Sequence, residues 1–103
     1  MSTRVLFQDV PRSERIAQDC EALASELRSE FPETSKVEIT LTRAGDQHET
    51  RVRVTGKDLD LAASSRGERQ TEAVSDAFDR ARRQLRKRHD KLIFGRRREA
   101  PHR

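Results

Sequence analysis

Hydrophobic residues recur every three or four positions in the first third of the chain. Between Arg12 and Phe31 they follow spacings of four, three, four and four, at Ile16, Cys20, Leu23, Leu27 and Phe31. Residues at such spacings share one face of a helix, so the segment predicts an amphipathic helix that Pro32 ends. Cys20 falls on the apolar face, and we interpret it as a small buried hydrophobe rather than a reactive thiol.

The pattern changes to alternation after this helix. Apolar and polar residues alternate in KVEITLT from Lys36, in TRVRVT from Thr50 and in LDLAA from Leu59. A period of two predicts strands with one buried face. The turns AGD at 44–46 and TGKD at 55–58 are short enough for a meander of antiparallel hairpins, and VLF at 5–7 is a candidate strand before the first helix.

A second helix is predicted to begin between Glu68 and Thr71. Its apolar stripe comprises Val74, Ala77, Phe78, Ala81, Leu85 and Leu92. The predicted fold is therefore α+β, in the order β-α-β-β-β-α, with two helices packed on one face of a four-stranded sheet. This arrangement resembles the fold of double-stranded-RNA-binding domains. We expect one domain over residues 1–94 and a flexible basic tail over 95–103.

Positive charge is concentrated in the last quarter of the chain. Residues 80–98 hold ten Lys or Arg and one acid, a net +9, whereas the other residues hold twelve and seventeen, a net −5. Such segregation predicts a localised positive face that binds a phosphate backbone. The alternative is a merely solvated helix face, which is the usual meaning of a charge run.

The cations of the second helix are the candidate RNA-binding residues. The helical spacing places four of them on the outer surface: Arg80, Arg83, Lys87 and Lys91. Arg82 and Arg86 extend this surface around one side of the helix, and Arg88 lies near the core edge. Without Trp or Tyr, stacking on bases has few candidates, so we expect recognition of shape and phosphates. Phe94 is either an RNA contact or part of the core or of a disordered end.

Other functional classes find little support in the sequence. His48, placed in an exposed hairpin loop, His89 on the helix surface and His102 in the tail lack metal-ligand spacing, and no nucleophile motif is present. We therefore expect neither catalysis nor a cofactor nor a metal. No apolar run of ~18 residues or signal peptide occurs, which together with a single Cys indicates a cytoplasmic protein. An interaction module for an acidic partner remains the alternative to RNA binding.

The second half of the chain resembles the ribosome hibernation promoting factor and ribosome-associated inhibitor family, of the short, sigma-54 modulation protein type. The final helix of that family ends approximately in D-K-L-x-R-Q-L-x-K-x-K-D-K-L. The residues here that match are Asp79, Arg83, Gln84, Leu85, Lys87, Asp90, Lys91 and Leu92, with Arg80 as a basic equivalent, and Gly67, Ala73 and Val74 fit upstream. The chain departs from the family at Arg69, Thr71 and Ser75, where Asp, Tyr and Asp are common.

The resemblance implies a partner and an activity. It implies a factor that binds the small ribosomal subunit, against 16S ribosomal RNA in the channel for messenger and transfer RNA, and so inhibits translation during stress or stationary phase. We expect a monomer when the protein is free of the ribosome. The remaining alternative is a diverged paralogue that binds another structured RNA or an acidic partner.

Overall fold

The computed structural model describes the backbone of residues 2–99 and the side chains of residues 2–90. The element order β-α-β-β-β-α is confirmed. The elements are β1 (Ser2–Phe7), α1 (Glu14–Glu30), β2 (Thr34–Ala44), β3 (Gln47–Gly56), β4 (Leu59–Gly67) and α2 (Gln70–Glu99).

The four strands form one mixed sheet in the order β1-β2-β3-β4. The two predicted hairpins are present, because β3 pairs antiparallel with both β2 and β4. β1 pairs parallel to β2, which requires the crossover that α1 provides. The β2–β3 turn contains Gly45 at φ 64° and the β3–β4 turn contains Asp58 at φ 57°, two positions in the left-handed region that Gly and Asp tolerate better than most residues.

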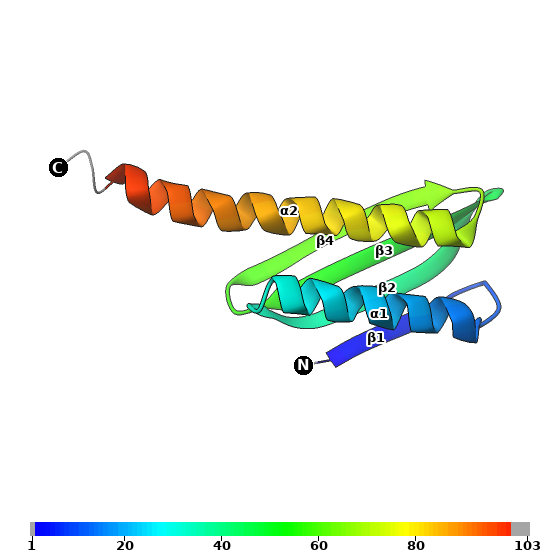
Figure 1. Ribbon diagram of the computed structural model, residues 1–103. Coiled ribbons are helices and arrows are strands. Elements are labelled where there is room, and N and C mark those ends of the chain that lie inside the picture. Colours follow the sequence, from blue (N-terminus) through cyan, green and yellow to red (C-terminus); the bar gives the residue numbers. More distant parts are fainter. Residues whose placement is uncertain (1, 100–103) are drawn as a thin grey trace.

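Both helices cover the same face of the sheet, with α1 over β1 and β2 and α2 over β3 and β4 (Figure 1). The core lies between these layers, and its alternating strand residues confirm the faces predicted from the sequence. The fully buried strand side chains include Val37, Ile39, Leu41, Val52 and Val54. The other face of the sheet carries the polar residues of each alternation and has no covering layer among the described residues.

A capping residue fixes the start of the first helix. Ser13 is the N-cap, and its hydroxyl accepts a hydrogen bond from the Ile16 amide at 3.3 Å, which satisfies a donor that the first turn leaves open. Cys20 lies on the buried face of this helix and is 0% exposed, as predicted. Burial raises the pKa of its thiol to about 12, so the group is neutral at physiological pH.

The second helix begins within the predicted window and continues to Glu99, beyond the end of the sheet (Figure 1). Its backbone therefore includes residues 95–99, which the sequence pattern assigned to a tail. Residues 100–103, with His102, lie outside the described residues, as do the side chains of Leu92 and Phe94. The division at residue 94 stays a prediction.

Candidate nucleic-acid interface

The rotation of α2 on the sheet decides where each of its cations points. Ala77, Ala81 and Leu85 are each 0% exposed and fix the buried face. On one side of that face, the Gln84 amide donates a hydrogen bond to the carbonyl oxygen of Ala62 in β4 at 3.3 Å. α2 therefore has a flank toward β4, an opposite flank toward α1 and an outer surface between them.

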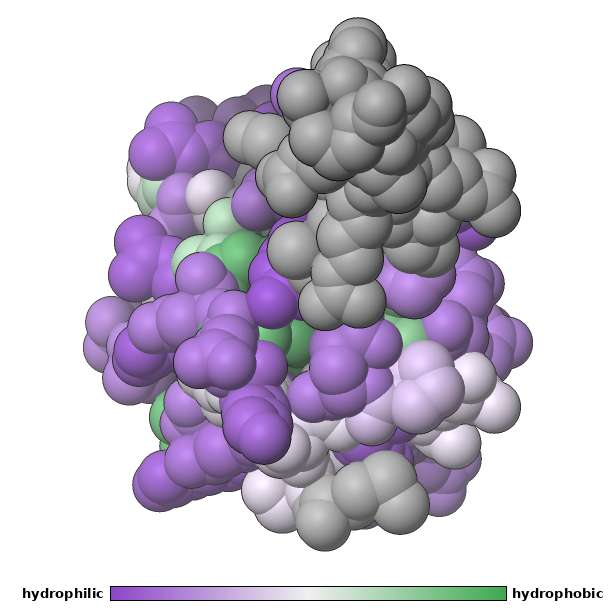
Figure 2. All heavy atoms as spheres, turned by 90° about the vertical axis from the view of Figure 1, so that its left-hand side faces the viewer, coloured by the Kyte–Doolittle hydropathy of each residue, from purple (hydrophilic) through white to green (hydrophobic). Residues whose placement is uncertain are grey.

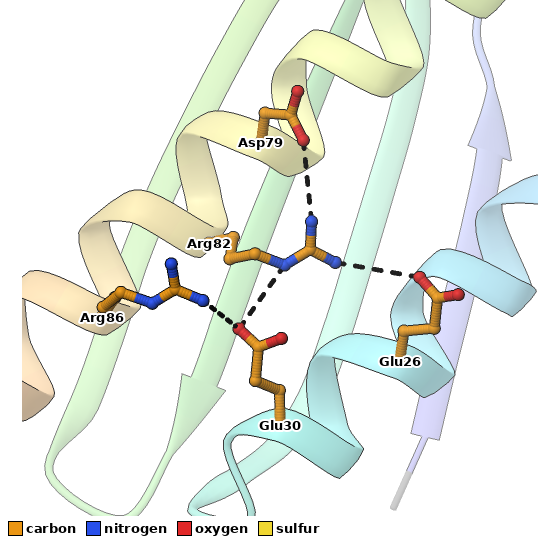
Figure 3. A network of polar contacts seen from close by, with 5 residues as sticks. All are labelled: Glu26, Glu30, Asp79, Arg82 and Arg86. Atoms are coloured by element: carbon orange, nitrogen blue, oxygen red, sulfur yellow. Dashed lines mark hydrogen bonds and ion pairs between the residues drawn. The ribbon is translucent and has the colours of Figure 1, made fainter.

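The flank toward α1 carries two of the predicted cations, and both are paired with carboxylates (Figure 3). Arg82 lies 3.8 Å from Glu26, 3.6 Å from Glu30 and 3.6 Å from Asp79. Arg86 lies 3.0 Å from the same oxygen of Glu30. We call these five residues the interhelical ion cluster. Two of its three acids come from α1, so the local sequence of α2 reveals only the pair of Asp79 and Arg82.

A third predicted cation, Arg88, holds α2 to the β3–β4 turn. Its guanidinium donates to the carbonyl oxygen of Asp58 at 2.7 Å and lies 3.9 Å from Glu33. Its side chain is 30% exposed, which agrees with the position near the core edge expected from the sequence. His89 lies on the helix surface as expected, with its Nδ1 also 3.9 Å from Glu33.

The other cations form what we call the outer cationic stripe: Arg80, Arg83 and Lys87. All three are exposed, and spacings of three and four place them on one side of the helix. None of them makes an ion pair with the side chains of residues 2–90. The side chain of Lys91, the seventh candidate, lies outside the described residues. Of the predicted residues, the structure thus presents three as unpaired cations on one surface.

The open face of the sheet carries charges of both signs in pairs. Arg53 in β3 donates two hydrogen bonds to Asp60 in β4, at 3.1 and 3.0 Å. These bonds lower the pKa of Asp60 and raise the pKa of Arg53. Arg66 pairs with Glu49 at 3.2 Å. An exception is the exposed Arg51 of β3, which belongs to this face and makes no ion pair with the side chains of residues 2–90. The open face therefore carries mixed charge, whereas the outer cationic stripe consists of cations.

The placement of His48 in an exposed loop was wrong. His48 belongs to β3, where it is half-buried and pairs with Arg43 of β2. The polar sequence around it suggested a wide loop, but the ladder continues to Ala44 and Gln47 and leaves a turn of only two residues. The backbone pairing therefore overrides the low apolar content of this segment.

Seen from the end toward which α2 runs, hydrophilic residues dominate the surface, and only small hydrophobic areas show between them (Figure 2). Residues 2–99 contain no helix that is both long and apolar enough to cross a membrane. Among the described residues, no group of three or more His, Cys, Asp or Glu could hold a metal ion. The cationic outer side of α2 is therefore the feature of the site with the clearest chemical preference, and that preference is for anions.

Comparison with known proteins places this geometry in context. The structure is similar to a ribosomal subunit interface protein from Coxiella burnetii, with a TM-score of 0.81 and 16% identity over 88% of this chain and 100% of the other. It is also similar to the N-terminal domain of Protein Y from Thermus thermophilus, with a TM-score of 0.73 and 14% identity over 82% of this chain and 93% of the other. At such identities the likeness shows the fold. No curated protein matches the sequence. Residues 4–93 match the family described as sigma 54 modulation protein / S30EA ribosomal protein, and the chain belongs to this family, as the resemblance of its second half indicated.

Proposed function

We propose that this protein binds the small ribosomal subunit through 16S ribosomal RNA and inhibits translation by occupying the channel for messenger and transfer RNA. Family membership supports a ribosomal partner, and the similar protein from Coxiella burnetii is named a ribosomal subunit interface protein. The proposal places the protein in the cytoplasm, as a monomer when free, and active under stress or in stationary phase. Occupying a channel requires binding alone, so the proposed mechanism includes no catalytic step.

The observation that carries the proposal is the outer cationic stripe. Arg80, Arg83 and Lys87 lie on a helix whose orientation is fixed by its buried face. The backbone that carries them therefore loses little conformational entropy when they contact a partner. Contacts of this kind neutralise phosphates and release counterions, and each neutralised phosphate steepens the dependence of log affinity on log salt by about 0.7 to 0.9. They position a protein on folded RNA and carry little base specificity.

The placement of the aromatic residues supports recognition of shape rather than of bases. Phe31 is 4% exposed and Phe78 is 1% exposed, so neither ring offers a face on which a base could stack. Phe7 is partly buried, with the Arg12 guanidinium over its ring at 5.6 Å. A contact from Phe94 remains a prediction. Among the described side chains, the groups best suited to RNA are therefore phosphate-binding cations.

Reversing the charge of the stripe tests the proposal. The double variant Arg83→Glu with Lys87→Glu leaves the core unchanged, because both side chains are exposed. It should abolish co-sedimentation with small subunits in sucrose gradients at low salt, since the local field then repels phosphates. The parent should co-sediment and be released by high salt.

The matched control makes the same change in net charge elsewhere. Arg15 on α1 and Arg43 at the end of β2 are exposed and make no ion pair with the side chains of residues 2–90. Their double reversal should weaken binding much less. A folded Arg83→Glu, Lys87→Glu variant that binds subunits as tightly as the parent would refute the proposed interface. Co-purification of the parent with protein that resists ribonuclease would instead indicate an acidic partner.

A further inference from the structure

Arg82 and Arg83 are adjacent in the chain but lie in opposite electrostatic surroundings. The side chain of Arg82 is 26% exposed and has three carboxylates within 4 Å, at 3.8, 3.6 and 3.6 Å. Arg83 is exposed and makes no ion pair with the described side chains of residues 2–90. A change of one position in the helix thus separates a neutralised cation from one that is available to an anion.

The interhelical ion cluster as a whole does not attract phosphate. It contains the two cations Arg82 and Arg86 and the three anions Glu26, Glu30 and Asp79, so its formal charge is −1. A phosphate that approached either arginine would also come close to these carboxylates, and the Arg86 guanidinium already donates a hydrogen bond to Glu30 at 3.0 Å. Ion pairs at a surface contribute only about 0 to 1 kcal/mol to stability, so stability gives a weak reason for such a cluster.

The cluster has a position that gives it a second role. It fills the seam between α1 and α2 on the side away from β4 (Figure 3). Glu33, which lies near Arg88 and His89, continues the acidic margin toward the β3–β4 turn. The carboxylates of the cluster therefore lie on the flank of α2 that faces α1, whereas the outer cationic stripe lies on its outer surface.

We propose that Glu26 and Glu30 are specificity-determining residues that restrict RNA to the outer cationic stripe. They neutralise Arg82 and Arg86 and repel phosphates from the seam, so the RNA backbone meets α2 only from the side away from α1. The acids thereby fix the orientation of the domain on its RNA. This inference rests on the proposed function and adds to it the residues that limit the contact surface.

The first test compares the adjacent arginines in the full chain. Salt dependence of binding to isolated small subunits is measured for Arg82→Gln and for Arg83→Gln. Arg83→Gln should flatten the slope of log affinity against log salt by about 0.7 to 0.9, the loss of one phosphate contact. Arg82→Gln should leave the slope unchanged. Equal flattening by both variants would overturn the inference, because Arg82 would then contact RNA despite its carboxylates.

The second test removes the acids. In the double variant Glu26→Gln with Glu30→Gln, Arg86 loses its carboxylate partner, whereas Arg82 keeps Asp79. The slope should steepen by about one phosphate, so that a fourfold rise in salt costs about threefold more affinity than in the parent. Adding Arg86→Gln to this variant should restore the parental slope.

The control double variant is Asp19→Asn with Glu21→Gln. Both residues are exposed acids of α1 without an ion pair among the described side chains, so it changes the net charge equally and should keep the parental slope. Circular dichroism verifies that each variant is folded. Parental slopes in a folded Glu26→Gln, Glu30→Gln variant would refute the inference alone. A parent that fails to bind small subunits would refute the proposed function and the inference with it.

Discussion

Leu85 links the core to the surface that carries the cations, and shortening it measures how firmly α2 is held. Leu85 is 0% exposed and belongs to the same buried cluster as Phe78 and Ala81. Leu85→Ala removes three carbon atoms, worth about 2.4 kcal/mol at ~0.8 kcal/mol each. A residual cavity of ~50 Å³ would add about 1.2 kcal/mol. We therefore expect the free energy of unfolding to fall by about 3.5 kcal/mol.

The loss should be visible as a change in melting temperature. A domain of this size loses about 4 to 8 °C for each kcal/mol, so far-UV circular dichroism should show a fall of roughly 14 to 28 °C. Arg83→Ala two positions earlier is the control, since exposed substitutions usually change stability by less than about 0.5 kcal/mol. Below its melting temperature the Leu85→Ala variant should still bind subunits, because its cations are intact. A melting temperature within 3 °C of the parent (about 0.5 kcal/mol) would refute the packing described for α2.

Two further predictions concern positions away from the stripe. Burial raises the pKa of the Cys20 thiol to about 12, so the folded state favours the neutral thiol. The contribution of this group to the free energy of unfolding is complete below pH 9. It falls by about 1.4 kcal/mol for each pH unit as the pH rises from 9 toward 12. Melts of the parent and of Cys20→Ala should diverge over that interval, and parallel curves would contradict the burial. At Gly56 an added Cβ would lie 2.1 Å from the carbonyl oxygen of Glu33, so Gly56→Ala should destabilise the domain by about 1 to 3 kcal/mol in chemical denaturation; a neutral effect would show that the two backbones are farther apart.

Periodicity was sufficient to predict most of the fold. A spacing of three and four places Ile16, Cys20 and Leu27 in the core, and alternation places Val37, Val52 and Leu59 there. These patterns reflect burial on one face, which is the main energetic reason for each element. The parallel pairing of β1 and the end of α2 at Glu99 were harder to derive, because neither depends on a local hydrophobic pattern.

The candidate site was predicted only in its overall charge. Arg82 and Arg83 look equivalent in the sequence, since both belong to a run of cations with few acids within one helical turn. The carboxylates that distinguish them come from Glu26 and Glu30, more than fifty positions from Arg82 in the chain, and the packing of α1 beside α2 brings them together. Ion pairs between distant elements have no signature in helical spacing.

The parallel placement of β1 bears on how the molecule opens and what it then exposes. β2, β3 and β4 follow one another through tight turns, whereas β1 joins only after the chain has passed through α1, so that Ser2 pairs with Lys36. β1 lies at the edge of the sheet, and its side chains such as Val5 and Phe7 are only half-buried. It is therefore held by fewer contacts than the interior strands, and its amide hydrogens should exchange before those of the β2–β3–β4 meander. Its departure would convert β2 from an interior strand into an open edge, which recruits strands of other molecules. The hydrogen bond from Arg28 of α1 to Thr3 of β1 opposes that departure and so helps to keep the edge of β2 covered.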